Sequence, residues 1–98
     1  MDIKYKNKKL KKVCTDAHEA QKVYGAAMAD KIHQRIDQII AADSVEFMTR
    51  FQIGNCHPLK FNRKDQYAVD LVQPFRLVFT AERDLVQIAV ILEIVDYH

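Results

Sequence analysis

Residues 66–79, QYAVDLVQPFRLVF, decide the fold that this sequence predicts. Large apolar side chains alternate along both halves of the stretch: Tyr67, Val69, Leu71, Phe75, Leu77 and Phe79. A period of two is typical of strands that bury one face, and it puts Arg76 on the opposite face. Gln73 and Pro74 alone separate the alternating segments, so we expect an antiparallel hairpin.

A third strand is expected in residues 86–98, VQIAVILEIVDYH. Its side chains are apolar at odd and even positions alike from Ile88 to Val95. Such a strand is typically central and covered on both faces, and helices from the first half of the chain are the expected cover. The connection into this strand is expected at residues 80–85, TAERDL.

Residues before 57 have a helical period instead. Asp16 can cap a helix that begins at DAHE, with Glu19 completing a capping box. The expected core face of this helical region consists of Met28, Ile32, Ile36, Ile39 and Ile40. Gly25 either ends a first short helix or lies within a longer one.

A second brief helix is expected in residues 44–51, SVEFMTRF, and a short first strand near residues 3–6, IKYK. The predicted fold class is therefore α+β. A small antiparallel sheet, mixed at its first strand, packs against N-terminal helices in a single domain over residues 1–98.

Composition limits the class of protein. Apolar residues make up 49% of the chain and charged residues 29%, with a formal net charge of +2, as in an ordinary globular protein. No apolar run reaches the roughly 18 residues of a membrane span, and the N-terminus lacks the apolar core of a secretory signal. We expect a cytoplasmic protein without a membrane partner, whose Cys14 and Cys56 are reduced, shielded thiols.

Positive charge gathers near the N-terminus. Six lysines occur in residues 4–12 without an acidic residue among them: Lys4, Lys6, Lys8, Lys9, Lys11 and Lys12. Such a cluster forms either a solvated face or a surface that attracts a phosphate backbone, and the sequence favours neither reading.

The end of the third strand carries groups that can bind or transfer protons. By alternation, Asp96 and His98 point to one side of the strand and Tyr97 to the other. A second polar set precedes and enters the hairpin, and it consists of His57, Lys60, Arg63, Lys64 and Arg76.

These residue types suit the cleavage of RNA by its own 2′-hydroxyl. The reaction needs a base, an acid and positive charge on the phosphorane oxygens, and it requires no metal or cofactor. Histidine suits both proton transfers, and arginine or lysine suits the phosphate. A metal site from Cys56, His57, Asp96 and His98 is disfavoured, because no pair has a recognised zinc spacing.

The same residues carry a resemblance to a known family. HPLKFNRKDQYAVDLVQPFRLVF followed by a terminal IVDYH is similar to the HigB-type plasmid-maintenance killer toxins, a branch of the RelE/ParE toxin superfamily. The matching positions are His57, Leu59, Lys60, Arg63, Tyr67, Phe75, Arg76, Leu77, Phe79, Asp96, Tyr97 and His98. The family's loop glycines are replaced by Phe61 and Asp65, so we expect Asn62 or Asp65 to adopt a left-handed conformation there.

The resemblance implies a toxin of a toxin–antitoxin system, an mRNA interferase that cleaves messenger RNA in the ribosomal A site. It implies an active site of His57, Asp96, Tyr97 and His98, with Lys60, Arg63 and Arg76 holding phosphates. It also implies a helix-turn-helix antitoxin as protein partner, and ribosomal RNA as the partner of the N-terminal lysines.

Two other functions remain possible on the sequence. A toxin of the ParE branch shares this fold and inhibits DNA gyrase by binding, without catalysis. A degenerate toxin would only bind its antitoxin. The sequence does not address the codon preference, the oligomeric state, or which histidine acts as acid and which as base.

Overall fold

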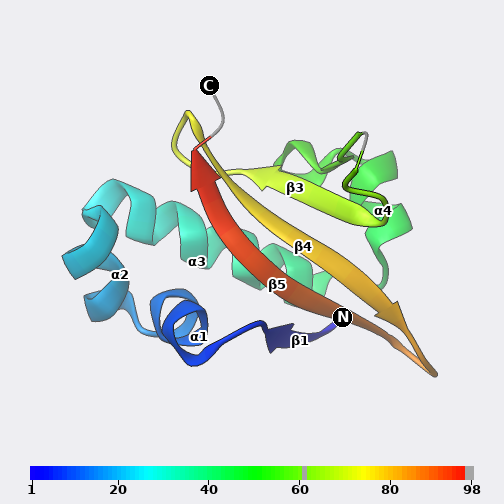
Figure 1. Ribbon diagram of the computed structural model, residues 1–98, viewed down its shortest axis with the longest axis horizontal. Helices are drawn as coiled ribbons and strands as arrows, with labels where there is room; N and C mark the ends of the chain where they lie inside the picture. Colours follow the sequence, from blue (N-terminus) through cyan, green and yellow to red (C-terminus); the bar gives the residue numbers. More distant parts are fainter. Residues whose placement is uncertain (61, 97–98) are drawn as a thin grey trace.

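The computed structural model describes residues 1–60 and 62–96, and Phe61, Tyr97 and His98 lie outside that part. Its elements follow one another as β1 (Asp2–Tyr5), α1 (Lys8–Thr15), α2 (Ala17–Tyr24), α3 (Ala26–Ala41), α4 (Val45–Arg50), the 3-10 turn η1 (Ile53–Asn55), β2 (His57–Pro58), β3 (Gln66–Asp70), β4 (Phe75–Arg83) and β5 (Gln87–Asp96). Helices therefore occupy the first half of the chain, and strands β2 to β5 the second (Figure 1).

The strands form a five-stranded sheet in the order β1-β5-β4-β3-β2. β1 pairs parallel to β5, and the other neighbouring strands pair antiparallel. This confirms the predicted α+β class with a sheet mixed at its first strand. It also confirms the central position of β5, which lies between β1 and β4.

The helices pack against one face of this sheet. In Figure 1, β4 and β5 pass in front of α3, and α4 lies behind β3. The shared core joins helix residues such as Ile32 and Met48 to Leu77, Phe79 and Ile91 of the sheet, all of them inaccessible to solvent. The expectation of helices on both faces of β5 is therefore wrong within the described residues.

A β-bulge contributes to that error. Phe79 pairs with Ile91 and Val78 pairs with Glu93, so Leu92 is an extra residue in β5. An extra residue reverses the alternation of side chains beyond it. Ile91 and Ile94 therefore both pack against the core although their positions differ in parity. Ile88, Val90 and Val95 belong to the opposite face and are only half-buried, so their apolar character does not reflect cover by helices.

Two helix ends differ from expectation. The lysine run folds as α1, capped by the Asn7 side chain, which accepts from the Leu10 amide at 2.8 Å. Asp16 caps α2 as predicted, accepting from the amides of residues 18 and 19. Its own amide already donates to the carbonyl of Lys12, however, so the reciprocal half of the capping box is not required.

Other differences concern single positions. Gly25, at φ +87°, ends α2 and begins α3, which resolves the alternative left open above. Ile40 is 49% exposed and does not belong to the core face. β4 continues to Arg83, so most of the expected connection at residues 80–85 is strand.

Both cysteines are free and buried, and burial raises the pKa of each thiol to about 12. This agrees with the expected shielded thiols. In the described part of the chain, no helix combines the length and apolar character that crossing a membrane demands.

Candidate functional site

The sheet face opposite the helices, called here the open face, carries three residues of the predicted site: His57, Arg63 and Arg76. Cross-strand partners share a face, so the register defines its rows. One row runs through His57, Ala68, Val78 and Glu93 across four strands. The next row includes Asp70 and Arg76, which pair directly.

His57 begins the two-residue strand β2 and is half-buried. Its Nδ1 lies 2.8 Å from the carbonyl oxygen of Asn55. A carbonyl only accepts hydrogen bonds, so Nδ1 carries the hydrogen and donates. In the neutral imidazole the lone pair then resides on Nε2, which is the form that a general base needs.

Arg76 projects from the beginning of β4 onto the open face. Its Nε lies 3.5 Å from Oδ1 of Asp70, and the two side chains are 29% and 23% exposed. The other carboxylate oxygen of Asp70 accepts from Nδ2 of Asn55 at 3.0 Å. Arg76 is therefore held beside a carboxylate on a strand, with its side chain 29% exposed.

Arg63 approaches the open face from the β2–β3 loop. Its Nη1 donates to Oε2 of Glu93 at 2.8 Å and to Oε1 of Gln66 at 3.3 Å. The side chain thus reaches from β3 to β5 and covers the row that contains Ala68 and Val78, neither of which has any exposed surface. The ion pair itself is 38% and 42% exposed, and pairs of this kind contribute only about 0–1 kcal/mol. A phosphate can therefore compete for the guanidinium.

The loop between β2 and β3 exposes Lys60 and Lys64 to solvent. Asp65 takes the left-handed conformation, at φ +62°, as one of the two expected alternatives. Its carbonyl accepts from the Thr80 hydroxyl at 2.6 Å, which ties the end of the loop to β4.

Asp96 lies on the other face. It pairs with Phe75, whose ring contacts Tyr24 of α2 edge-on at a centroid distance of 6.1 Å. The register therefore places Asp96 on the helix-covered face, opposite His57 and Arg76. Tyr97 and His98, the other two terminal residues of the predicted site, lie outside the described residues.

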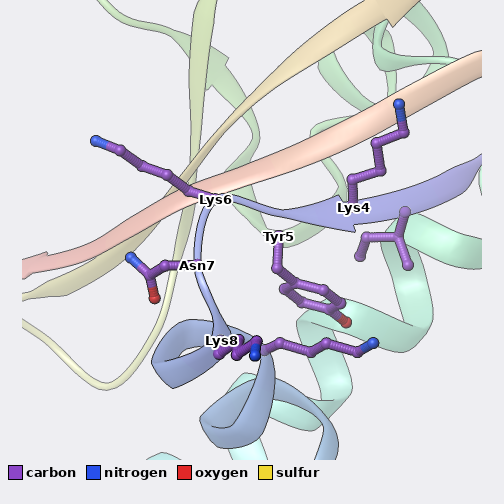
Figure 2. Close-up of a pocket in the computed structure, with 7 residues that line it drawn as sticks. Lys4, Tyr5, Lys6, Asn7 and Lys8 are labelled. Atoms are coloured by element: carbon purple, nitrogen blue, oxygen red, sulfur yellow. The ribbon is translucent and has the colours of Figure 1, made fainter.

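The N-terminal lysines border the same open face. Figure 2 shows Lys4 and Lys6 pointing to the side opposite Tyr5, whose ring turns toward the helices. Burial, then the neighbouring Cys14, raises the pKa of that tyrosine. A hollow of about 490 Å³ along the edge of β1 is lined by Lys4, Lys6, Lys8 and Lys11 among others. Positive charge thus continues from the open face around the β1 edge.

Across residues 1–60 and 62–96, no three histidine, cysteine, aspartate or glutamate side chains gather as a metal ion would require.

Sequence reasoning missed Asn55, Asp70 and Glu93. Alternation alone puts Asp70 on the face opposite Val69 and Leu71, so one of the three was detectable as a polar residue on the open face. The positions of Asn55 and Glu93 depend on the strand register and on the bulge, which leave no signal in one sequence.

Comparison with known proteins gives one informative result. No protein-family model matches the chain, and no curated protein sequence matches it. Among solved structures it is similar to the YoeB/ParE toxin from Agrobacterium tumefaciens, with a TM-score of 0.63 and 15% sequence identity over 100% of both chains. At this identity the similarity shows the fold alone. The chain therefore has the fold of a YoeB/ParE toxin.

Proposed function

We propose that this protein is the toxin of a toxin–antitoxin pair and acts as a ribosome-dependent mRNA interferase of the HigB type. The observation that carries the proposal is the position of His57 and Arg76 on the sheet face opposite the helices, with Nε2 of His57 as the proton acceptor. The shared fold with a YoeB/ParE toxin supports it.

The proposed reaction uses the 2′-hydroxyl of the substrate as nucleophile. Nε2 of His57 takes the 2′-hydroxyl proton, and the 2′-oxygen attacks the adjacent phosphorus. The bond from phosphorus to the 5′-oxygen breaks, and an acid from the terminal residues Tyr97 or His98 protonates that oxygen. The products are a 2′,3′-cyclic phosphate and a 5′-hydroxyl, so protons and bonds balance without a metal.

Three cations are proposed to hold phosphate. Arg76 projects from a strand and Arg63 lies across the open face, so both guanidiniums are positioned before RNA arrives. Lys60 extends from the exposed loop and is proposed to contact a neighbouring phosphate as a point charge.

Two macromolecular partners follow from the proposal. The lysines around the β1 edge would contact ribosomal RNA, because phosphate contacts dominate the affinity of such interfaces. A helix-turn-helix antitoxin would neutralise the toxin. A cytoplasmic location belongs to the same proposal, since the ribosome is the site of action.

The decisive experiment expresses the protein alone and maps mRNA ends with and without translation. We expect cleavage only on translated messages. His57→Gln and His98→Ala should each strongly reduce cleavage while the protein stays folded, whereas His18→Gln, which changes an exposed histidine on α2, is the matched control. General base catalysis contributes about 10²- to 10⁴-fold, so residual cleavage by His57→Gln should fall at least that far.

The alternative is a ParE-like inhibitor of DNA gyrase that acts by binding. The position of Asp96 on the helix-covered face favours it, because a binder needs no converging acid and base. A gyrase supercoiling assay run beside the mRNA mapping separates the two. Gyrase inhibition without new mRNA ends, or full toxicity of His57→Gln at equal soluble expression, would refute the interferase proposal.

A further inference from the structure

Asp70 contacts Arg76 directly and is linked to His57 through Asn55. One carboxylate oxygen lies 3.5 Å from Nε of Arg76, and the other accepts from Nδ2 of Asn55 at 3.0 Å. The carbonyl of the same Asn55 accepts from Nδ1 of His57. A continuous chain of contacts therefore runs from His57 through Asn55 and Asp70 to Arg76.

The backbone of Asp70 is anchored from the helical layer. Nε of Arg35, on α3, donates to the carbonyl oxygen of Asp70 at 2.6 Å, and Nη1 of Arg35 donates to Gln38 at 2.9 Å. Gly54 passes directly over this guanidinium, because a Cβ at Gly54 would lie 2.9 Å from Cδ and Nε of Arg35. Arg35 thus fixes the end of β3 and the turn η1 in one arrangement.

The carboxylate of Asp70 also holds the side chain of Arg76 in place. Its side chain is 23% exposed, and Oδ1 makes no hydrogen bond within the described residues apart from its ion pair with Arg76. A carboxylate in that setting is stabilised by a guanidinium and destabilised without one. The pair therefore restrains Arg76 in the absence of RNA.

The contact with Asn55 acts on the histidine. Asn55 has a left-handed backbone, at φ +57°, which a side-chain hydrogen bond helps to maintain. That conformation directs the Asn55 carbonyl at Nδ1 of His57, which selects the tautomer whose Nε2 carries no hydrogen.

We propose that Asp70 is a positioning residue that couples His57 and Arg76: its carboxylate aims Arg76 and, through Asn55, fixes the tautomer of His57. The roles of the two coupled residues rest on the proposed function. The coupling itself is a property of the free protein and can be measured without RNA.

The first test uses nitrogen NMR of the free protein. The wild type should show His57 as the Nδ1–H tautomer. Asp70→Ala should produce a mixture of tautomers and faster exchange of the Arg76 Nε–H with solvent. Asp70→Asn retains an acceptor for Asn55, so it should change Arg76 and leave His57 unchanged. Asn55→Gly tolerates the left-handed backbone and should change His57 alone.

The second test measures cleavage on translating ribosomes. In Asp70→Ala both His57 and Arg76 lose their orientation, so kcat/KM should fall about 100-fold. In Asp70→Asn only the charge is lost, so kcat/KM should fall about tenfold. Asp37→Asn, an exposed aspartate on α3, is the matched control and should cleave as the wild type does.

The two tests separate two kinds of failure. If the wild type cleaves no mRNA, the proposed function is wrong, while the NMR comparison still decides the coupling. If folded Asp70→Ala keeps the Nδ1–H tautomer and the Arg76 exchange rate of the wild type, Asp70 does not position either residue and the proposal is overturned. Circular dichroism identifies any variant that does not fold, and Asp70→Asn then carries the test.

Discussion

Replacing Gly54 by alanine tests the packing beneath the candidate site. Gly54 has φ +60°, a conformation that costs a residue with a Cβ about 1–2 kcal/mol. The new Cβ would also lie 2.9 Å from Cδ and Nε of Arg35, which is closer than Cβ atoms in proteins approach other heavy atoms. Arg35 would have to move, and its Nε is bound to the Asp70 carbonyl at 2.6 Å.

The size of the effect follows from these two costs. A hydrogen bond from a charged group contributes about 1.5–3 kcal/mol, so Gly54→Ala should lower the free energy of unfolding by about 2.5–5 kcal/mol in total. In a domain of this size, that corresponds to a fall in Tm of at least about 10 °C. Domains of this kind have about 5–15 kcal/mol of stability, so most of the molecules should still fold.

A double-mutant cycle with Arg35→Ala isolates the clash. Urea unfolding of the four proteins gives the cost of Gly54→Ala with and without the guanidinium. Without Arg35, that cost should fall to the conformational part, about 1–2 kcal/mol. Gly25→Ala is the control, because its φ is +87° but a Cβ there would meet no atom within 4 Å. Its cost should be the same in both backgrounds. Equal costs of Gly54→Ala with and without Arg35 would refute the packing described here.

Three further predictions concern stability and reactivity. Ile32→Ala removes a side chain with no exposed surface and should lower the free energy of unfolding by about 2–5 kcal/mol in urea titrations. Hydrogen bonds from Arg83, then Gln87, lower the pKa of Glu46 from 4.5 to about 2. The ionised Glu46 should therefore contribute its full share to the free energy of unfolding above pH 4.5, and that share should be lost as the pH falls through about 2. The free energies of unfolding of the wild type and Glu46→Gln should differ more at pH 6 than at pH 2.5. A difference that stays constant with pH would contradict this. Cys14 and Cys56, whose pKa burial raises to about 12, should react with a thiol reagent only as fast as the protein unfolds, and rapid labelling in native buffer would show that they are accessible.

Much of the fold could be predicted because strand signals are local. The alternation through residues 66–79 identified the hairpin of β3 and β4, and the long apolar run identified β5 as central. A separate first helix, α1, was not predicted within the helical region, because its surface is mostly lysine and only Val13 and Cys14 are buried. Helices so weakly apolar depend on tertiary packing more than on a pattern in the sequence.

The candidate site was predictable in part. His57, Arg63 and Arg76 were named from residue type and resemblance; the register puts His57 and Arg76 on the open face, and Arg63 reaches it from the loop to bond Glu93. Asn55 was missed because its contact with Asp70 joins η1 to β3 across 15 residues of the chain. Contacts of this kind arise from the pairing of β2 with β3 and leave no pattern along the chain.

The bulge at Leu92 has the largest consequence for the site. Strict alternation from Ile91 would place Asp96 on the open face and Glu93 against the helices. The extra residue reverses both positions, so Glu93 shares the row of His57 and bonds to Arg63, while Asp96 pairs with Phe75 on the other face. A role for Asp96 beside His57 therefore requires its side chain to pass around the end of the sheet, whereas Glu93 needs no such change. Comparing cleavage by Glu93→Gln and Asp96→Asn ranks the two carboxylates: a larger loss in Glu93→Gln would assign the acidic partner of the open face to the residue that the bulge turns toward it.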